Sequence, residues 1–271
     1  MPELPEVEVT RLGLLPHIVD QTIEKVCIYQ HQLRWPVPSD VAELSGQTVR
    51  NVRRRGKYLL IDVASGSIMV HLGMSGHLQW TSVTAPRRKH DHIEVYFTNQ
   101  LSCLRYHDPR RFGSWLWLPK THSSHPLLQH LAPEPLTPTF NAAYLQKALS
   151  NRKKSIKLCL MDNQLVVGVG NIYANEVLFA CGIHPEKPAG LITPAACVKL
   201  VRHIKLILEQ AIEQGGTTLK DFAQADGKPG YFKQDLHVYG RQDEPCSQCS
   251  RPLSFKKLGQ RATVFCQHCQ H

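Results

Sequence analysis

CSQCSRPLSFKKLGQRATVFCQHC, residues 246–269, contains two Cys-x2-Cys pairs that are separated by sixteen residues. This spacing is typical of a zinc ribbon, in which two tight knuckles place four thiolates at the corners of a tetrahedron. A redox dithiol or four unpaired thiols are the alternatives, and two pairs at this distance favour zinc over both. We therefore expect one structural Zn²⁺, bound by Cys246, Cys249, Cys266 and Cys269.

The residues between the two pairs predict a two-stranded hairpin. LSFKKL and RATVFC alternate in polarity, and Gly259 and Gln260 stand near the expected turn. So small a module buries little apolar surface, so the metal would supply much of its stability. Four protein ligands leave no open position for catalysis. From residue 237 onward there are five Lys or Arg against two acidic residues, and Arg261 near the tip is placed to reach a phosphate or a DNA groove.

The first third of the chain predicts strands. Short segments rich in β-branched and aromatic residues are separated by Gly, Pro or polar turns, at 22–29, 58–64, 67–72 and 92–97. Their spacing indicates a sandwich or barrel-like sheet. A helix is expected before them over 6–19, with Pro5 in its first turn.

Helical patterns follow a proline-rich linker. Residues 119–138 hold five prolines and mark a domain boundary. Beyond them, apolar residues recur every three or four positions, which predicts helices over 142–149, 155–162, 171–180 and 194–214. The fold class is therefore α+β. We expect a β-sandwich domain over 1–132, a linker and first helical residues over 133–150, a helical domain over 151–236 and the ribbon over 237–271.

The charge of the chain favours a polyanionic partner. The 32 Lys and Arg exceed the 22 Asp and Glu, which gives a formal net charge of +10. Such a surplus is typical of proteins that bind nucleic acid, an anionic membrane surface or acidic proteins. No segment has the 18 or more apolar residues that a membrane span needs, and the acidic start MPELPEVEV is unlike a signal peptide. We expect a cytoplasmic protein.

The N-terminus offers an unusual nucleophile. Removal of the initiator methionine before Pro2 would leave a secondary amine, whose pKa is well below that of lysine. Attack on C1′ of a deoxyribose would expel the base and leave an iminium, which acidifies C2′ and permits elimination of the 3′ phosphate. Glu3 could act as the general acid and base that opens the sugar. Met-Pro-Glu alone is a common start, so this hypothesis depends on further motifs.

Those motifs are present, and the sequence resembles the formamidopyrimidine-DNA glycosylase family of bifunctional bacterial repair enzymes. The matching stretches extend over nearly the whole chain: MPELPEVE, RRGKYLL (54–60), HLGMSG (71–76), KHDH (89–92), DPRRFG (108–113), PEPL (133–136), LMDNQLVVGVGNIYANE (160–176), GIHP (182–185), QGGTTLKDF (214–222), DGKPGYF (226–232), VYGR (238–241) and the four cysteines with QRAT (260–263). The resemblance implies excision of 8-oxoguanine and formamidopyrimidines through a Schiff base with Pro2, followed by β,δ-elimination.

The resemblance also implies roles for individual residues. Pro2 is similar to the nucleophile and Glu3 to the acid, while Lys57 would assist β-elimination and Arg261 the second, δ, elimination. Met74, Arg110 and Phe112 resemble the wedge that fills the space of a flipped base and binds the orphaned cytosine. Asn171 would cap a helix of a helix–two-turn–helix unit that holds the DNA backbone. Further DNA contacts are implied at His90, Arg152, Lys157 and Tyr239, and residues 217–231 resemble the loop that closes over the purine.

Other features of the sequence agree with this resemblance. Arg50, Arg53, Arg54, Arg55 and Lys57 form a basic cluster that fits phosphate binding. Ser250 and Ala132 stand where the family usually has glycine, and neither touches the expected chemistry. The expected partner is duplex DNA with oxidised purines or abasic sites. We expect the protein to bind it as a monomer, to need no small-molecule cofactor and no membrane, and to be associated with the nucleoid.

Two alternatives stay open. An endonuclease VIII-like relative would share the fold and the N-terminal chemistry but act on oxidised pyrimidines; the leucine in MPELPEVE, the GGTTLKDF stretch and the Met-Arg-Phe wedge favour the purine enzyme. A non-catalytic zinc-ribbon protein that only binds DNA would not need Pro2, Glu3, Lys57 and Arg261 as a set.

Overall fold

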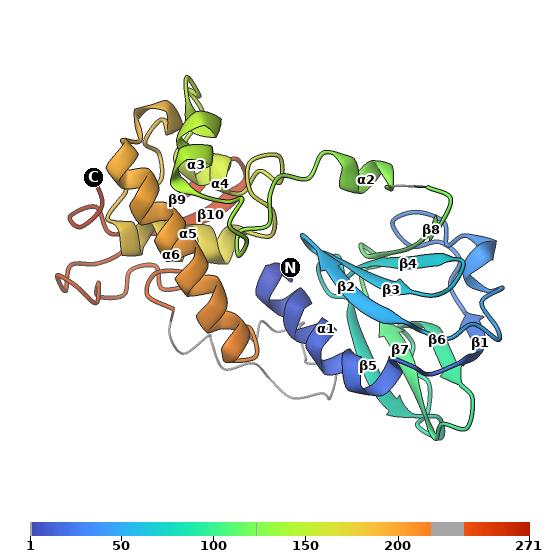
Figure 1. The fold of residues 1–271 in the computed structure, drawn as a ribbon. Coiled ribbons are helices and arrows are strands. Elements are labelled where there is room, and N and C mark those ends of the chain that lie inside the picture. Colours follow the sequence, from blue (N-terminus) through green and yellow to red (C-terminus); the bar gives the residue numbers. More distant parts are fainter. Residues whose placement is uncertain (1, 123, 218–235) are drawn as a thin grey trace. The chain divides into compact units, whose positions relative to one another are not determined.

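The first of two structural units holds two four-stranded antiparallel sheets (Figure 1). The computed structural model describes residues 2–122, 124–217 and 236–271. The first unit comprises Met1–Gln129 and Gln214–Lys233, and the second comprises His130–Glu213 and Gln234–His271. In the described part of the chain, no helix combines the length and apolarity that a membrane crossing requires. The predicted division into four domains stays a prediction.

The β-sandwich expected from the sequence is confirmed in the first unit. One sheet has the order β1-β6-β7-β5 and the other β2-β3-β4-β8. Helix α1 and the short elements η1 and α2 accompany them. The bounds are α1 Leu4–Ile18, β1 Ile23–Ile28, η1 Ser39–Val41, β2 Asn51–Arg55, β3 Tyr58–Asp62, β4 Gly66–His71, β5 His77–Ser82, β6 Asp91–Phe97, β7 Ser102–His107, β8 Ser114–Pro119 and α2 Pro126–Gln129.

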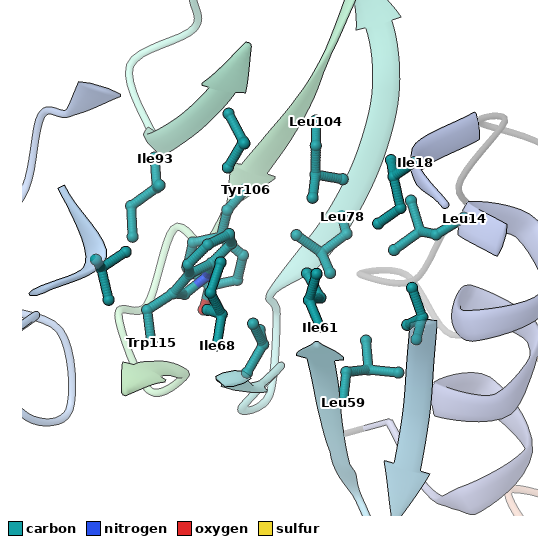
Figure 2. Close-up of a cluster of buried hydrophobic side chains, with 14 of the residues drawn as sticks. Leu14, Ile18, Leu59, Ile61, Ile68, Leu78, Ile93, Leu104, Tyr106 and Trp115 are labelled. Carbon is teal, nitrogen blue, oxygen red and sulfur yellow. The ribbon is translucent and has the colours of Figure 1, made fainter. Parts of the chain in front are cut away.

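The core of this unit lies between its two sheets (Figure 2). Ile61 and Ile68 come from one sheet and Leu78 and Leu104 from the other, and all four are at most 2% exposed. Alternation along each strand sends these side chains inward and the polar ones outward. Leu14 of α1 extends the same cluster, which ties the start of the chain to the sandwich.

The second unit contains the helices and the ribbon. Its elements are α3 Ala142–Leu149, α4 Ile156–Leu160, α5 Asn171–Cys181, η2 Ala189–Leu191, α6 Pro194–Glu213, β9 Ser254–Leu258 and β10 Arg261–Phe265. Helix α5 is buried over most of its length and ends at Gly182, whose φ of 67° gives the left-handed cap that glycine adopts without strain. The four helices expected from the sequence are therefore confirmed, with small shifts at their ends.

The predicted ribbon hairpin is confirmed. Strands β9 and β10 pair antiparallel, with Arg261 opposite Leu258. Gly259 and Gln260 form the two-residue turn between them, with φ values of 51° and 63°. Positive φ at both positions is the signature of the type I′ turn, whose twist matches that of the strands.

The ribbon also contains a strained residue that suggests a stabilising substitution. Ser250 has a φ of 61°, a conformation that costs an L-residue about 1–2 kcal/mol. We expect Ser250→Gly to raise the free energy of unfolding by about 0.5–1 kcal/mol, part of the gain being lost to glycine's greater entropy. Thermal unfolding of the zinc-loaded protein measures the change. Ser247→Gly, in the same loop without a positive φ, is the control, and an equal gain there would contradict the explanation.

Candidate functional site

The N-terminal residues Pro2 and Glu3 are buried and held in place by the start of α1. Glu3, 2% exposed, is the N-cap residue of this helix and forms a capping box with Glu6. The backbone N–H of Glu3 donates to Oε2 of Glu6 at 2.8 Å, and the N–H of Thr217 donates to Oε1 of the same carboxylate at 2.9 Å. A chain terminus is ordinarily mobile, so these contacts restrain the expected nucleophile before any substrate arrives.

Lys57 lies in the turn between β2 and β3 and is only 9% exposed. A lysine is rarely buried without a specific reason. Nearby, burial together with the charges of Lys57 and Arg34 lowers the pKa of His71 to about 4. His71 is therefore neutral at pH 7, and its Nδ1 accepts the N–H of Gly73 at 3.0 Å. This leaves the ring proton on Nε2.

The basic cluster around Lys57 is less available to phosphate than its sequence suggests. Arg53 donates to both carboxylate oxygens of Asp62, at 2.5 and 2.8 Å. Arg54 pairs with Glu8 at 2.8 Å. Burial would raise the pKa of Glu8, but hydrogen bonds from Arg11 and Arg54 hold it below its usual value. Two of the five cations thus form ion pairs within the protein, and phosphate binding by the cluster stays a prediction.

The loops that carry Met74 and Phe112 interlock. A side chain at Gly73 would collide with the backbone of Phe112 and Gly113, at 2.4–2.7 Å from its Cβ. Only glycine permits so close an approach. Phe112 is 46% exposed, and the guanidinium of Arg110 lies 4.7 Å from the centre of its ring. The expected exposed loops are therefore present.

Buried Asp108 fixes the geometry of these two loops. Its carboxylate accepts Ser75 Oγ at 2.8 Å, Tyr106 Oη at 3.0 Å and the N–H of Gly113 at 2.9 Å. Ser75 belongs to the first loop and Gly113 to the second, so one carboxylate holds both. The loops border a cavity of about 660 Å³, which is lined by Gln32, Leu33, Arg34, His71, Gly73, Met74, Arg110, Arg111 and Phe112.

His90 belongs to a group of aromatic rings beside β6. Its ring centre lies 5.9 Å from that of His107 and 6.2 Å from that of His92. Asp91, fully buried, holds Nδ1 of His107 at 2.7 Å, and Nε2 of His92 lies 2.8 Å from the carbonyl of Asp108. The neighbours of His90 are thus themselves fixed by hydrogen bonds.

In the second unit, Asn171 begins α5 but does not cap it. Gly170 is the N-cap residue, and no side-chain cap bond is made. The side-chain oxygen of Asn171 is buried and has no hydrogen-bond partner among the residues that the structure describes. The predicted cap was therefore wrong by one residue, because glycine takes the extended N-cap conformation (φ −118°, ψ −155°).

Three other predicted DNA contacts lie in the second unit. Half-buried Arg152 has its guanidinium 3.8 Å from the Asp162 carboxylate. The backbone N–H of Tyr239 donates to Glu176 at 2.7 Å. Lys157 is fully buried, and its ammonium donates to the carbonyl of Ala262 and the hydroxyl of Thr263. Lys157 therefore has no surface to offer to a phosphate, and the expected DNA contact at this residue is corrected.

The four ribbon cysteines gather as the sequence predicted. Their sulfur atoms all lie within 4.8 Å of one another, close to the roughly 3.8 Å between sulfurs that Zn–S bonds of about 2.3 Å give in a tetrahedron. Four thiols and no other donor type form a set typical of structural zinc. The residues therefore fit one Zn²⁺. Arg261, exposed at the start of β10, stands on the hairpin that this site supports.

The structure distributes the predicted residues over both units. Pro2, Glu3, Lys57, Met74, His90, Arg110 and Phe112 belong to the first unit, and Arg152, Lys157, Asn171, Tyr239, Arg261 and the cysteines to the second. The expected purine loop lies almost entirely outside the described residues. Sequence reasoning missed the supporting carboxylates Glu6, Asp108 and Glu176. The sequence pattern that could have revealed them is an acidic residue inside an apolar or turn-forming stretch.

Comparisons with known proteins bear on the whole chain. Residues 1–115 match the model of the formamidopyrimidine-DNA glycosylase N-terminal domain, and residues 131–223 match the H2TH domain of the same enzymes. A protein named formamidopyrimidine-DNA glycosylase from Shewanella halifaxensis is 59% identical over 270 residues, which cover 100% of this chain and 99% of the relative.

Solved structures give the same result. A complex between a Lactococcus lactis Fpg variant and DNA containing Fapy-dG has a TM-score of 0.93 and 34% identity, with 100% of both chains covered. A complex of the wild-type L. lactis protein with DNA containing an oxidised pyrimidine has a TM-score of 0.91 and 34% identity, again over 100% of both chains.

Proposed function

Because the chain belongs to the formamidopyrimidine-DNA glycosylase family and is a DNA glycosylase for oxidised purines in base excision repair, we propose that its N-terminal proline is the nucleophile. The same family membership makes it a lyase that acts on duplex DNA with damaged bases or abasic sites. The observation that carries the assignment to Pro2 is the buried capping box that holds Pro2–Glu3 at the start of α1.

The proposed reaction begins when the Pro2 nitrogen attacks C1′ of the damaged nucleotide. The bond between C1′ and the base breaks, and its electron pair leaves with the base, which takes up a proton. Glu3 protonates the sugar ring oxygen, so the ring opens and an iminium links Pro2 to C1′. Loss of a C2′ proton then supplies the electron pair that expels the 3′ phosphate. Loss of a C4′ proton from the resulting conjugated iminium supplies the pair that expels the 5′ phosphate.

The remaining site residues support this chemistry from several sides. We assign phosphate contacts to Lys57, to the side-chain NH2 group of Asn171 at the start of α5, and to Arg261 on the ribbon. The interlocked loops with Met74, Arg110 and Phe112 would fill the space that the flipped base leaves. His90, Arg152 and Tyr239 are assigned further contacts to the DNA. From these DNA contacts we infer that the protein acts at the nucleoid, in the cytoplasm.

The lesion preference is tested by trapping the Schiff base with borohydride. Duplexes contain 8-oxoguanine opposite cytosine, thymine glycol, or undamaged guanine as the control. We expect a covalent adduct that forms preferentially with the 8-oxoguanine duplex. Preference for thymine glycol would support the endonuclease VIII-like alternative. This substrate is included because an L. lactis Fpg structure contains DNA with an oxidised pyrimidine. Tight binding with no adduct would overturn the assignment to Pro2 and favour a DNA-binding protein without catalysis.

A further inference from the structure

Lys157 is a fully buried lysine on the short helix α4, and its ammonium group reaches the ribbon. Nζ donates to the carbonyl oxygen of Ala262 at 2.7 Å and to Oγ1 of Thr263 at 2.7 Å. Both acceptors belong to the beginning of strand β10, where Ala262 and Thr263 directly follow Arg261. Thr263 is itself fully buried. The ammonium thus contacts the strand at two consecutive residues.

A hydrogen-bond relay continues from this ammonium to Arg261 itself. The Thr263 hydroxyl, which accepts from Lys157, donates to the carbonyl oxygen of Arg261 at 3.2 Å. A hydroxyl can accept and donate at once, so the two bonds form one chain from Nζ to the backbone of Arg261. The carbonyl of the exposed arginine is therefore tied to the interior of the second unit.

Two further contacts hold the same hairpin against the helices. A Cβ on Gly259, at the hairpin turn, would lie 2.9 Å from Leu158, the neighbour of Lys157 on α4. On the other side, Asn175 of α5 accepts the N–H of Val264 at 3.0 Å. The hairpin is thus fixed at its turn by Leu158, behind Arg261 by Lys157 and further along β10 by Asn175.

Stability alone does not account for a lysine at this place. Removing an ammonium from water costs several kcal/mol, and a well-packed apolar side chain of similar volume is often as stable or more so. What the ammonium adds is direction, because its three donors select particular acceptors. The geometry points to a role in fixing where the start of β10 stands.

We propose that Lys157 is a positioning residue for Arg261, acting through Ala262 and Thr263 of β10. This inference depends on the function proposed for Arg261, which is to hold the phosphates beside the lesion and support the second elimination. A displacement of about 1 Å in a positioned group can lower a rate by about a hundredfold. Lys157 therefore affects the reaction without touching the DNA.

The test is a double-mutant cycle between Lys157→Met and Arg261→Ala. The readouts are the zinc content, the yield of borohydride adduct and the ratio of β,δ-elimination to β-elimination products on abasic duplex DNA. We expect Lys157→Met to keep its zinc but to lower the rate of the second elimination about 10- to 100-fold. In the Arg261→Ala background the same change should have no further effect, because the arginine through which it acts is gone.

Matched variants separate this role from a general loss of structure. Lys205 also donates from its ammonium to a backbone carbonyl in the second unit, that of Thr137 at 2.9 Å, so Lys205→Met is the control and should leave the product ratio unchanged. Thr263→Val removes only the relay hydroxyl and should lower the ratio by a smaller factor. If Lys157→Met does not fold, Thr263→Val decides the question, and an unchanged ratio in that variant overturns the proposal.

The outcomes also separate this inference from the function on which it rests. An unchanged product ratio in Arg261→Ala would refute the role of the arginine. A normal ratio in zinc-loaded Lys157→Met, with a lowered ratio in Arg261→Ala, would overturn the positioning role alone. The same holds if the two substitutions have additive effects on the rate.

Discussion

We expect a form of the protein that keeps Met1 ahead of Pro2 to form no borohydride-trapped adduct with 8-oxoguanine DNA and to nick this DNA at least about a thousandfold more slowly than the mature form. The physical reason is the state of the Pro2 nitrogen. In the mature chain it is a secondary amine, and an α-amino group has a pKa of about 8, so a useful fraction is unprotonated at neutral pH. With a residue before it, the nitrogen belongs to an amide and has no nucleophilic lone pair.

The measurement compares two preparations whose N-termini are determined by mass spectrometry. One is mature, and the other keeps Met1 because of an added N-terminal tag. Binding to a duplex with an uncleavable abasic-site analogue should change little, since the phosphate contacts assigned to Lys57, Asn171 and Arg261 do not involve the amine. A C-terminal tag of equal length is the control for bulk.

A second variant checks the chemistry of the same nitrogen. Pro2→Gly leaves a primary amine at the terminus, which can still form a Schiff base but lacks the ring that holds the nitrogen in place. It should retain weak activity and a trappable adduct. Full-speed nicking by protein that demonstrably keeps Met1 would refute the proposal for Pro2.

The placement of this nucleophile was only partly predictable from the sequence. MPELPEVE contains the proline, the acid and the helix start, and all three were anticipated. The capping box between Glu3 and Glu6 was not anticipated, although it is a local contact, because glutamate is not a usual N-cap residue. The further hydrogen bond from the Thr217 N–H to Glu6 joins residues more than two hundred positions apart, and no local pattern predicts it.

The same limit explains the main errors in the fold. Strands β1, β3, β4 and β6 were predicted from their β-branched and aromatic residues, whereas β2, β5, β7 and β8 were not predicted. Strand β2 reads NVRRR, in which only Val52 is fully buried, and β7 buries Arg105 against Glu94 with a nitrogen–oxygen distance of 2.7 Å. A charged residue that is buried in an ion pair is interpreted from the sequence as a surface residue, although it lies in the interior of the structure.

Lys157 shows the reverse case. The run RKKSIKLCL suggests a basic surface, and helical spacing alone does not reveal that the third lysine points inward. The turn and the four cysteines of the ribbon, by contrast, were predicted correctly, because they are local features. Sequence patterns therefore predict best where a structure depends on neighbouring residues, and the zinc site is such a place.

Replacing Cys249 by Ser should release the zinc and weaken binding to lesion-bearing duplexes by a large factor. The ribbon has a small apolar core, made by Phe179, Val238, Leu253 and Val264 together with the cysteines. Structural zinc contributes about 10–16 kcal/mol to the folding of such modules. Hydroxyl is a poor substitute for thiolate as a zinc ligand, so the hairpin that carries Arg261 should lose its fixed position.

The consequence for DNA binding follows from the charge of Arg261. Each phosphate contact contributes about −0.9 to the slope of log K against log salt concentration. Loss of the arginine contact should therefore make this slope shallower by about 1, besides lowering the affinity. Anisotropy titrations at several salt concentrations measure both quantities, and zinc release is followed with a chromogenic chelator.

Adduct formation by residues of the first unit is the control that separates loss of the ribbon from loss of the whole fold. Pro2, Glu3 and Lys57 belong to the first unit, outside the ribbon, so Cys249→Ser at high protein concentration should still form some borohydride adduct with abasic DNA. Cys27→Ser, at a half-buried cysteine of the first unit, should keep both the zinc and the salt slope. If Cys249→Ser retains one zinc and an unchanged slope, the ribbon is not the platform of Arg261. If it loses zinc but keeps full affinity, the arginine does not bind a phosphate, and the second elimination must draw its support from another residue.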